Sequence, residues 1–152
     1  MPVITIVTRI EAPIELCFDL ARSVDLHVES TTATQERAIE GVTAGLLKLN
    51  ELVTWEATHL GVRQRLTSRI TAFNRPHHFR DSQVRGPFHR FDHDHLFSRE
   101  RGGTIMRDVF DYTSPMGWLG RCVDWLVLEN YMRGFLQKRA EVIKMTAEKL
   151  HS

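Results

Sequence analysis

The sequence has few cysteines, and none of them has the spacing of a metal or redox motif. Cys17 and Cys122 are the only two in 152 residues. That is too few for the disulfide framework of a small secreted domain, and neither lies in a C-x-x-C pair. We therefore expect a protein of a reducing compartment, and the cytoplasm is the location that this composition favours.

Long hydrophobic runs without charge are also absent. The most apolar stretch, residues 118–136, is interrupted by Arg121, Asp124, Glu129 and Arg133. A membrane-spanning helix needs about 20 predominantly apolar residues, so this stretch does not predict one. The N-terminal residues alternate in polarity and do not form a basic segment followed by an apolar run, so we expect no secretory signal and no integral membrane segment.

Net charge is close to zero. The 20 basic and 19 acidic side chains leave a formal charge of +1, which provides no field for nucleic acid, and we expect no nucleic-acid partner. Arg63, Arg65 and Arg69 alternate along one segment. We interpret them as a solvated strand face with Glu56 as a cross-strand partner, with a phosphate-binding stripe as the alternative. A nucleophile elbow and a phosphate-binding glycine loop are both missing.

The patterns that are present predict one α+β domain over residues 1–152. Alternation and β-branched residues predict a strand at 3–10, and Pro13 suits the first turn of a short helix at 13–22. Residues 23–34 follow as a second short helical segment with a loop. Period-two patterning from 37 to 113, broken by glycines, predicts five or six antiparallel strands. Residues 116–150 lack proline and predict a long terminal helix.

The alternation also assigns faces to two of these strands. One face of the strand near 51–60 is expected to carry Val53, Trp55, Ala57 and His59. The covered face of the following strand is expected to carry Val62, Gln64, Leu66, Ser68, Ile70 and Ala72, with the arginines on the opposite, wet side.

Three stretches resemble a known superfamily. They are Glu11-Ala12-Pro13-Ile14-Glu15 with Phe18-Asp19-Leu20, then Val53-Thr54-Trp55-Glu56-Ala57, then the segment from Phe79 to Phe97. With the element order, they resemble the START-like (SRPBCC) superfamily of birch pollen allergen and of polyketide cyclase and dehydratase-like proteins, and a bacterial branch sometimes labelled cell division inhibitor. The resemblance implies a helix-grip fold, in which a curved antiparallel sheet of six or seven strands surrounds the long C-terminal helix, with two short helices after the first strand.

The same resemblance implies an internal cavity that holds a small hydrophobic, lipid-like molecule. Strand parity supports a polar side to that cavity, because His93 and His95 share the parity of Phe91 and Phe97. Apolar surroundings with a few polar groups are typical of ligand sites. The predicted ligand-binding set is Trp55, Asp81, Gln83, Phe91, His93, His95, Met106, Asp108, Phe110, Trp125 and Met132. The alternatives are that the polar members satisfy one another, or that a bulge at Gly86-Pro87 reverses the parity.

Chemistry beyond binding stays open at this stage. His-x-His is also a zinc spacing, with Asp81 or Asp108 as a third ligand, but the resemblance implies no metal or cofactor and we expect none. Histidine beside carboxylate can act as general acid or base, so a cyclase or dehydratase-type enzyme is the alternative to the noncatalytic binding protein that we favour. Catalytic residues are not assigned. A role in cell division rests on the label alone, and the oligomeric state is open, a homodimer being one alternative.

Overall fold

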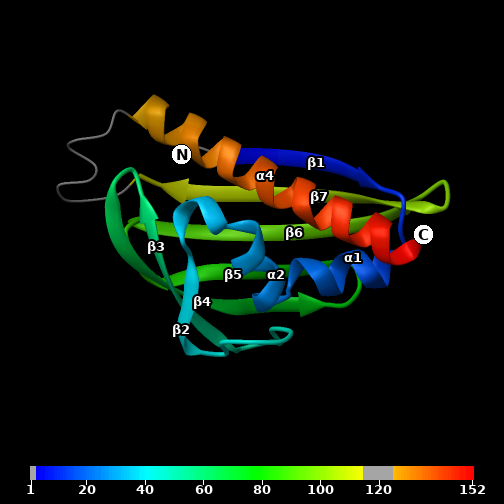
Figure 1. The fold of residues 1–152 in the computed structure, drawn as a ribbon, viewed down its shortest axis with the longest axis horizontal. Helices are drawn as coiled ribbons and strands as arrows, with labels where there is room; N and C mark the ends of the chain where they lie inside the picture. The colour runs from blue at the N-terminus through cyan, green and yellow to red at the C-terminus, as the bar shows by residue number, and fades with distance from the viewer. Residues whose placement is uncertain (1–2, 115–124) are drawn as a thin grey trace.

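The structure, a computed structural model, describes residues 3–114 and 125–152. Within these ranges the chain forms a curved sheet with helices on one face (Figure 1). The elements, in chain order, are β1 (Val3–Ile10), α1 (Ile14–Ala21), α2 (Val24–Ser30), the 3-10 turn η1 (Thr32–Thr34), β2 (Arg37–Gly41), β3 (Leu52–His59), β4 (Val62–Asn74), β5 (His78–Arg85), β6 (Arg90–Glu100), β7 (Gly103–Thr113) and α4 (Trp125–His151).

In the described part of the chain, seven antiparallel strands form one sheet in the order β1-β7-β6-β5-β4-β3-β2. Neighbours from β2 to β7 follow one another in sequence, whereas β1 joins the far edge by pairing with β7 from Val3↔Asp111 to Ile10↔Thr104. The predicted strand number, the two short helices and the α+β class are confirmed. At the β6–β7 hairpin, Arg101 and Gly102 both have positive φ, the backbone conformation of tight turns that match strand twist.

Strands β6 and β7 place one set of alternate residues on the concave face. Their register pairs Phe91 with Tyr112, His93 with Phe110, His95 with Asp108 and Phe97 with Met106, and all eight side chains are buried. The parity expected for this segment is therefore correct, and the turn at Gly86-Pro87 does not reverse it.

The parity expected for β4 is wrong at its end. The pairing with β5 shifts between Ile70 and Ala72, so Ala72 lies opposite Arg80, and Phe73 lies opposite Phe79. An extra residue in one strand reverses the faces beyond it. Phe73 therefore takes the inward position predicted for Ala72, and its ring packs edge-on against Phe18 with centroids 5.4 Å apart.

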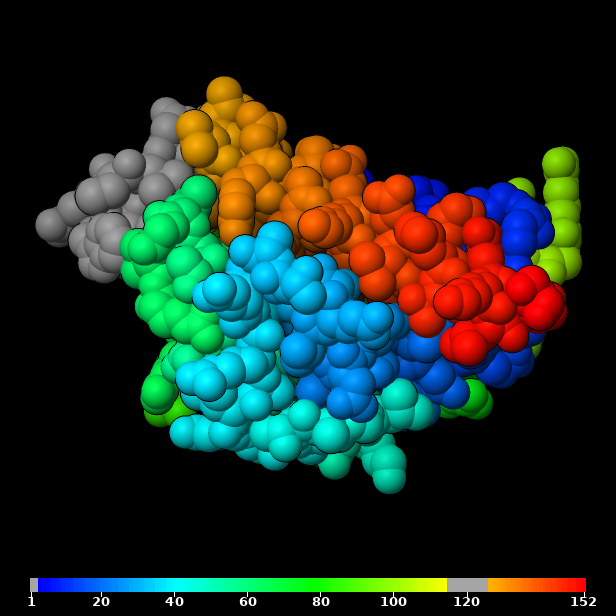
Figure 2. Space-filling model, in the orientation of Figure 1, coloured from blue at the N-terminus to red at the C-terminus, as the bar shows by residue number. Residues whose placement is uncertain are grey.

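Helix α4 packs on the concave face beside α1 and α2, as expected for the terminal helix (Figure 1). Its buried residues recur at three- and four-residue spacing: Leu128, Met132, Leu136, Arg139, Ala140, Ile143 and Ala147. In Figure 2 the orange-to-red side chains of α4 adjoin the blue ones of α1 and α2, so the helices together cover the sheet. Residues 116–124 of the predicted helix lie outside the described ranges. No helix in the described residues is long and apolar enough to cross a membrane.

The convex face is polar, as the arginine pattern predicts. Glu56 accepts hydrogen bonds from Arg37, Arg63 and Arg65, at 2.7 to 3.2 Å. These guanidinium groups lower the pKa of Glu56 to about 2. The stripe therefore has a carboxylate partner within the sheet.

Asp19 fastens α1 to the turn between β4 and β5. Its carboxylate accepts two hydrogen bonds from Arg22, at 2.7 and 2.9 Å, and two from Arg75, at 2.7 and 3.0 Å. The hydrogen bonds from Arg75, opposed by burial and aided by Arg22, hold the pKa of Asp19 below its ordinary value. A depressed carboxyl pKa stabilises the fold above the unfolded-state pKa and ceases to do so as the pH falls through the folded value.

We expect Asp19→Asn to lower the free energy of unfolding at pH 7 by about 1 kcal/mol, the scale of well-formed surface ion pairs. The difference from wild type should shrink as the pH falls below about 4, the ordinary aspartate pKa, because protonation then removes the same charge from wild type. Urea unfolding at several pH values measures it. Glu141→Gln on the exposed side of α4 is the control, and a difference between wild type and Asp19→Asn that is constant with pH contradicts the assignment.

Candidate functional site

A cavity with a volume of about 130 Å³ lies between the concave face of the sheet and the helices. Most of its lining is apolar. The large apolar side chains include Trp55, Leu66, Ile70, Phe79, Phe88, Phe91, Phe110, Leu128, Met132, Phe135 and Leu136. They come from five strands, the β5–β6 turn and α4. The cavity thus lies where the helix crosses the curved sheet.

Seven of the predicted residues line this cavity: Trp55, Asp81, Phe91, His93, His95, Phe110 and Met132. Asp108 does not line it, but it is buried directly behind the two histidines. The side chain of Trp125 lies outside the described part of the chain. Parity therefore brings most of the set together, and ligand binding by these residues stays a prediction.

Gln83 and Met106 lie away from the cavity lining. The Gln83 side chain closes the β5–β6 turn, because its Nε2 donates to the Phe88 carbonyl at 2.7 Å and its Oε1 accepts from the Phe88 N–H at 3.2 Å. Met106 is completely buried in the hydrophobic core, opposite Phe97. Shared strand parity put both residues on the correct face but could not show how far along the strand the cavity extends.

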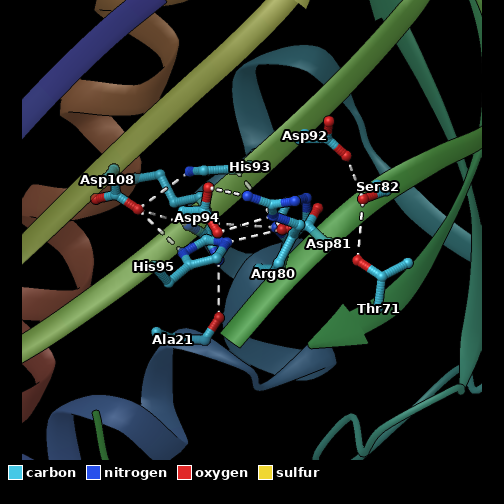
Figure 3. Close-up of polar contacts among 12 residues, drawn as sticks. Ala21, Thr71, Arg80, Asp81, Ser82, Asp92, His93, Asp94, His95 and Asp108 are labelled. Carbon is cyan, nitrogen blue, oxygen red and sulfur yellow. Dashed lines mark hydrogen bonds and ion pairs between the residues drawn. The ribbon is translucent and has the colours of Figure 1, made fainter. Parts of the chain in front are cut away.

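The polar part of the cavity is a four-residue cluster of Asp81 on β5, His93 and His95 on β6 and Asp108 on β7. Figure 3 shows the two imidazoles between the two carboxylates. His95 Nε2 lies 2.7 Å from Asp81 Oδ1, and His93 Nε2 lies 3.1 Å from Asp108 Oδ1. His95 Nδ1 is 3.0 Å from Asp108 Oδ1, within ion-pair range, although the pair does not meet hydrogen-bond geometry. The cluster therefore joins three adjacent strands.

Both carboxylates stay ionised. Burial alone would raise the pKa of Asp81, but the hydrogen bond from His95 and the nearby positive charges of His95 and Arg139 lower it to about 2. Burial opposes ionisation of Asp108 as well, and its contacts with His93 and His95 hold its pKa far below the ordinary range. Two negative charges consequently lie in the cavity wall and directly behind it, on the sheet face that α4 covers.

The two histidines respond in opposite directions. Burial favours neutral His95, but contacts with Asp108 and Asp81 outweigh burial and raise its pKa. His93 is also buried and next to a charged His95, and these effects lower its pKa despite Asp108 and Asp81. Because both carboxylates only accept, His95 fits as the imidazolium, which donates from Nε2 to Asp81 and has its Nδ1 3.0 Å from Asp108 Oδ1. His93 fits as the neutral ring, donating from Nε2 to Asp108 and leaving the Nδ1 lone pair free.

Arg139 is the main polar residue that the predicted set lacked. Its Nη2 donates to the Ala21 carbonyl at 2.8 Å, and its Nη1 lies 4.0 Å from Asp108 Oδ1. Its Nε donates to His27 Nδ1 at 3.2 Å, and His27 Nε2 lies 2.9 Å from Glu36 Oε1. The spacing of Arg139 from Leu136 and Met132 placed it on the buried face of α4, a signal that could have found it. Nothing in the polar segment around His27 and Glu36 predicts their position.

The opposite side of the cavity has polar atoms that no described residue satisfies. Glu36 Oε2 and Gln64 Nε2 are buried and have no hydrogen-bond partner in the described part of the chain, and both residues line the cavity. Nearby in the lining, His59 Nδ1 is hydrogen-bonded to the Tyr131 hydroxyl at 2.7 Å. One free acceptor and one free donor therefore belong to the lining of the cavity.

No protein-family model and no curated protein matches the chain. Solved structures match it over almost its whole length. A Thermus thermophilus protein has a TM-score of 0.80 at 15% identity, covering 99% of this chain and 100% of that one. A START superfamily protein from Mycobacterium smegmatis has a TM-score of 0.72 at 8% identity, covering 97% and 98%.

The ginseng major latex-like protein 151 from Panax ginseng has a TM-score of 0.69 at 15% identity, covering 96% of this chain and 97% of that one. All three identities are too low to transfer an activity, because one fold serves many functions. The three matches each cover at least 96% of this chain, so they support the fold described above. The chain has a helix-grip fold, and its likeness to these solved structures is a likeness of fold.

Proposed function

We propose that the protein binds a small, mainly apolar molecule that has at least one hydrogen-bonding group. The supporting observation is that Asp81, His93 and His95 form a polar patch in a mainly apolar cavity lining. Burying such groups is unfavourable unless they are paired, and a ligand site is where apolar walls and a few polar groups occur together. The apolar walls supply affinity, and the patch orients the polar end of the ligand.

The cavity volume sets the size of the ligand. At about 130 Å³ it has room for the centres of roughly ten water molecules. That space suits a bicyclic ring system or a short alkyl chain rather than a two-chain lipid. The unsatisfied atoms Glu36 Oε2 and Gln64 Nε2 support a ligand that brings further hydrogen-bonding groups, since buried polar atoms normally have partners.

We expect 2-naphthol to bind about 2–10 times more tightly than naphthalene, because the hydroxyl gains one hydrogen bond worth about 0.5–1.5 kcal/mol. In His93→Phe or His95→Phe this ratio should fall towards one. Fluorescence titration in the presence of a chelator measures both ligands, and naphthalene serves as the internal control for any change in folding.

Ser68→Phe provides the control for the location of binding. Ser68 lines the cavity from β4 and is 4% exposed, so a phenyl ring there occupies cavity space and should weaken both ligands alike. Unchanged affinities in this variant would place the bound molecules elsewhere. An unchanged ratio in both histidine variants would remove the polar patch from the binding site.

A cyclase or dehydratase-type enzyme is the second candidate. The observation that favours it is the opposite shift of the two histidine pKa values, because acid–base sites commonly pair groups whose environments push their pKa values apart. Neutral His93 presents a free Nδ1 lone pair as the base, and protonated His95 is the acid beside it. The centroids of the two imidazole rings are 3.9 Å apart.

If this second candidate is right, the protein should catalyse exchange of the α-protons of an enolisable ketone such as 2-tetralone in deuterium oxide. NMR measures the exchange. His93→Phe should abolish catalysed exchange, whereas His78→Phe, which changes a histidine paired with Asp94 on the outer face, should leave it intact. Exchange at the rate of the buffer alone, with 2-tetralone bound, would leave a noncatalytic binding protein.

Asp108 positions the imidazoles in either case, and its removal should affect folding strongly. We expect Asp108→Asn to lower the free energy of unfolding by about 3–5 kcal/mol, the usual result of removing one partner of a buried ion pair. Asp94→Asn is the matched control on the outer face of β6, where the carboxylate accepts from His78 and Arg80, and it should lose about 1 kcal/mol. Equal losses in urea unfolding would contradict the central role of Asp108.

A further inference from the structure

Asp81, His93 and His95 direct three potential metal-ligand atoms at one another. One donor atom from each residue lies within 4.8 Å of the other two. The arrangement follows from the sheet, because His93 and His95 alternate on the same face of β6 and Asp81 is paired with His93 on β5. All three residues also line the cavity.

Asp108 faces the opposite edge of both rings. Its Oδ1 lies 3.1 Å from His93 Nε2 and 3.0 Å from His95 Nδ1. The remaining nitrogens, His93 Nδ1 and His95 Nε2, lie 3.8 and 2.7 Å from Asp81 Oδ1. Histidine ligands of metals typically give their second nitrogen to a carboxylate, which fixes the tautomer and the ring orientation. Here Asp108 accepts a hydrogen bond from His93 Nε2 and lies within ion-pair range of His95 Nδ1.

We propose that His93 Nδ1, His95 Nε2 and an oxygen of Asp81 bind a divalent first-row transition-metal ion such as Zn²⁺, with Asp108 holding the two imidazoles and an open coordination position facing the cavity. Two imidazoles and one carboxylate form a ligand set that suits these ions, and three protein ligands with one open position are typical of reactive zinc sites. Mg²⁺ and Ca²⁺ prefer sites built from oxygen alone.

Coordination of zinc at this site requires little movement of the three side chains. Zinc bonds of about 2.0–2.2 Å place tetrahedral ligand atoms a little over 3 Å apart, so side-chain shifts on the order of 1 Å suffice. The ion would replace the proton shared between His95 and Asp81 and would neutralise the carboxylate. Asp81 differs in this respect from Asp94 on the outer face, which Arg80 already pairs through two hydrogen bonds.

The open position connects this site to the cavity without depending on the proposed ligand. A metal ion there would accept a water molecule or an oxygen of a bound molecule, and it would supply Lewis acidity that the side chains lack. The metal site and the apolar cavity can therefore be tested separately on the same protein.

The test is to treat the full chain with a chelator, remove the chelator and titrate Zn²⁺ by isothermal calorimetry. We expect one ion per chain with a micromolar or tighter dissociation constant, and no comparable binding of Mg²⁺. Co²⁺ should give the intense visible absorption of a low-coordinate nitrogen and oxygen site, and Zn²⁺ should displace it. Zn²⁺ should also raise the thermal unfolding midpoint, since an ion that binds only the folded state stabilises it.

Asp81→Asn and His93→Gln should each weaken Zn²⁺ binding by about 100-fold or more, because loss of an outer carboxylate partner alone commonly costs 10–100-fold. His78→Gln and Cys122→Ser are the controls for adventitious histidine and thiol binding and should bind as wild type does. The two variants change different ligands, so one remains informative if the other does not fold.

Absence of stoichiometric Zn²⁺ binding by folded wild type would overturn the proposal. So would binding that survives both Asp81→Asn and His93→Gln, or that is lost in Cys122→Ser. The result is independent of the naphthol measurements, which are made with a chelator present. Naphthol binding without Zn²⁺ binding would refute the metal site alone, and Zn²⁺ binding without naphthol binding would refute the proposed organic ligand alone.

Discussion

Two carboxylates on the sheet face that the helices cover, those of Asp81 and Asp108, are the constraint on which this site depends. Asp108 is 2% exposed, and Asp81 lies on the cavity wall on the other side of the two imidazoles. Ionised groups in such a place destabilise the fold unless opposite charges and hydrogen-bond donors accompany them. His93 and His95 provide these donors. Because the histidines are on β6 and the carboxylates are on β5 and β7, the charges can be paired only when these three strands are in register. The strand register that pairs the charges therefore also sets the geometry of the site.

Carboxylates on the outer face of the sheet are paired differently, mainly with arginines. There Asp94 accepts from His78 and Arg80, and Glu56 accepts from three arginines, all at the edge of solvent. Inside, the nearest guanidinium is that of Arg139, whose Nη1 stays 4.0 Å from Asp108. The inner cluster consequently relies on imidazoles, whose charge can change near neutral pH, where guanidinium groups would be permanently charged.

The fold and much of the site could be predicted from the sequence, because strand alternation is a local property. Phe91, His93, His95 and Phe97 have the parity of a buried face in the printed sequence, and the structure buries all four. Local patterns fail where the outcome depends on long-range geometry. The bulge near Thr71 exchanges Ala72 for Phe73, and Gln83 turns to the Phe88 backbone instead of the cavity. Glu36 lines the cavity from a short segment without periodicity, so no sequence pattern predicts its position.

Arg139 connects the two polar regions of the cavity. It bonds the Ala21 carbonyl and His27 Nδ1, and His27 in turn contacts Glu36. Because His27 Nδ1 accepts from a guanidinium N–H, the ring proton must sit on Nε2 and point to Glu36. A continuous series of polar contacts thus runs from Glu36 through His27 and Arg139 to within 4.0 Å of Asp108. In an interior of low dielectric, a charge gained or lost at either end changes the field at the other. A change of charge at either end of this series therefore acts on the other end through one residue of the terminal helix, Arg139.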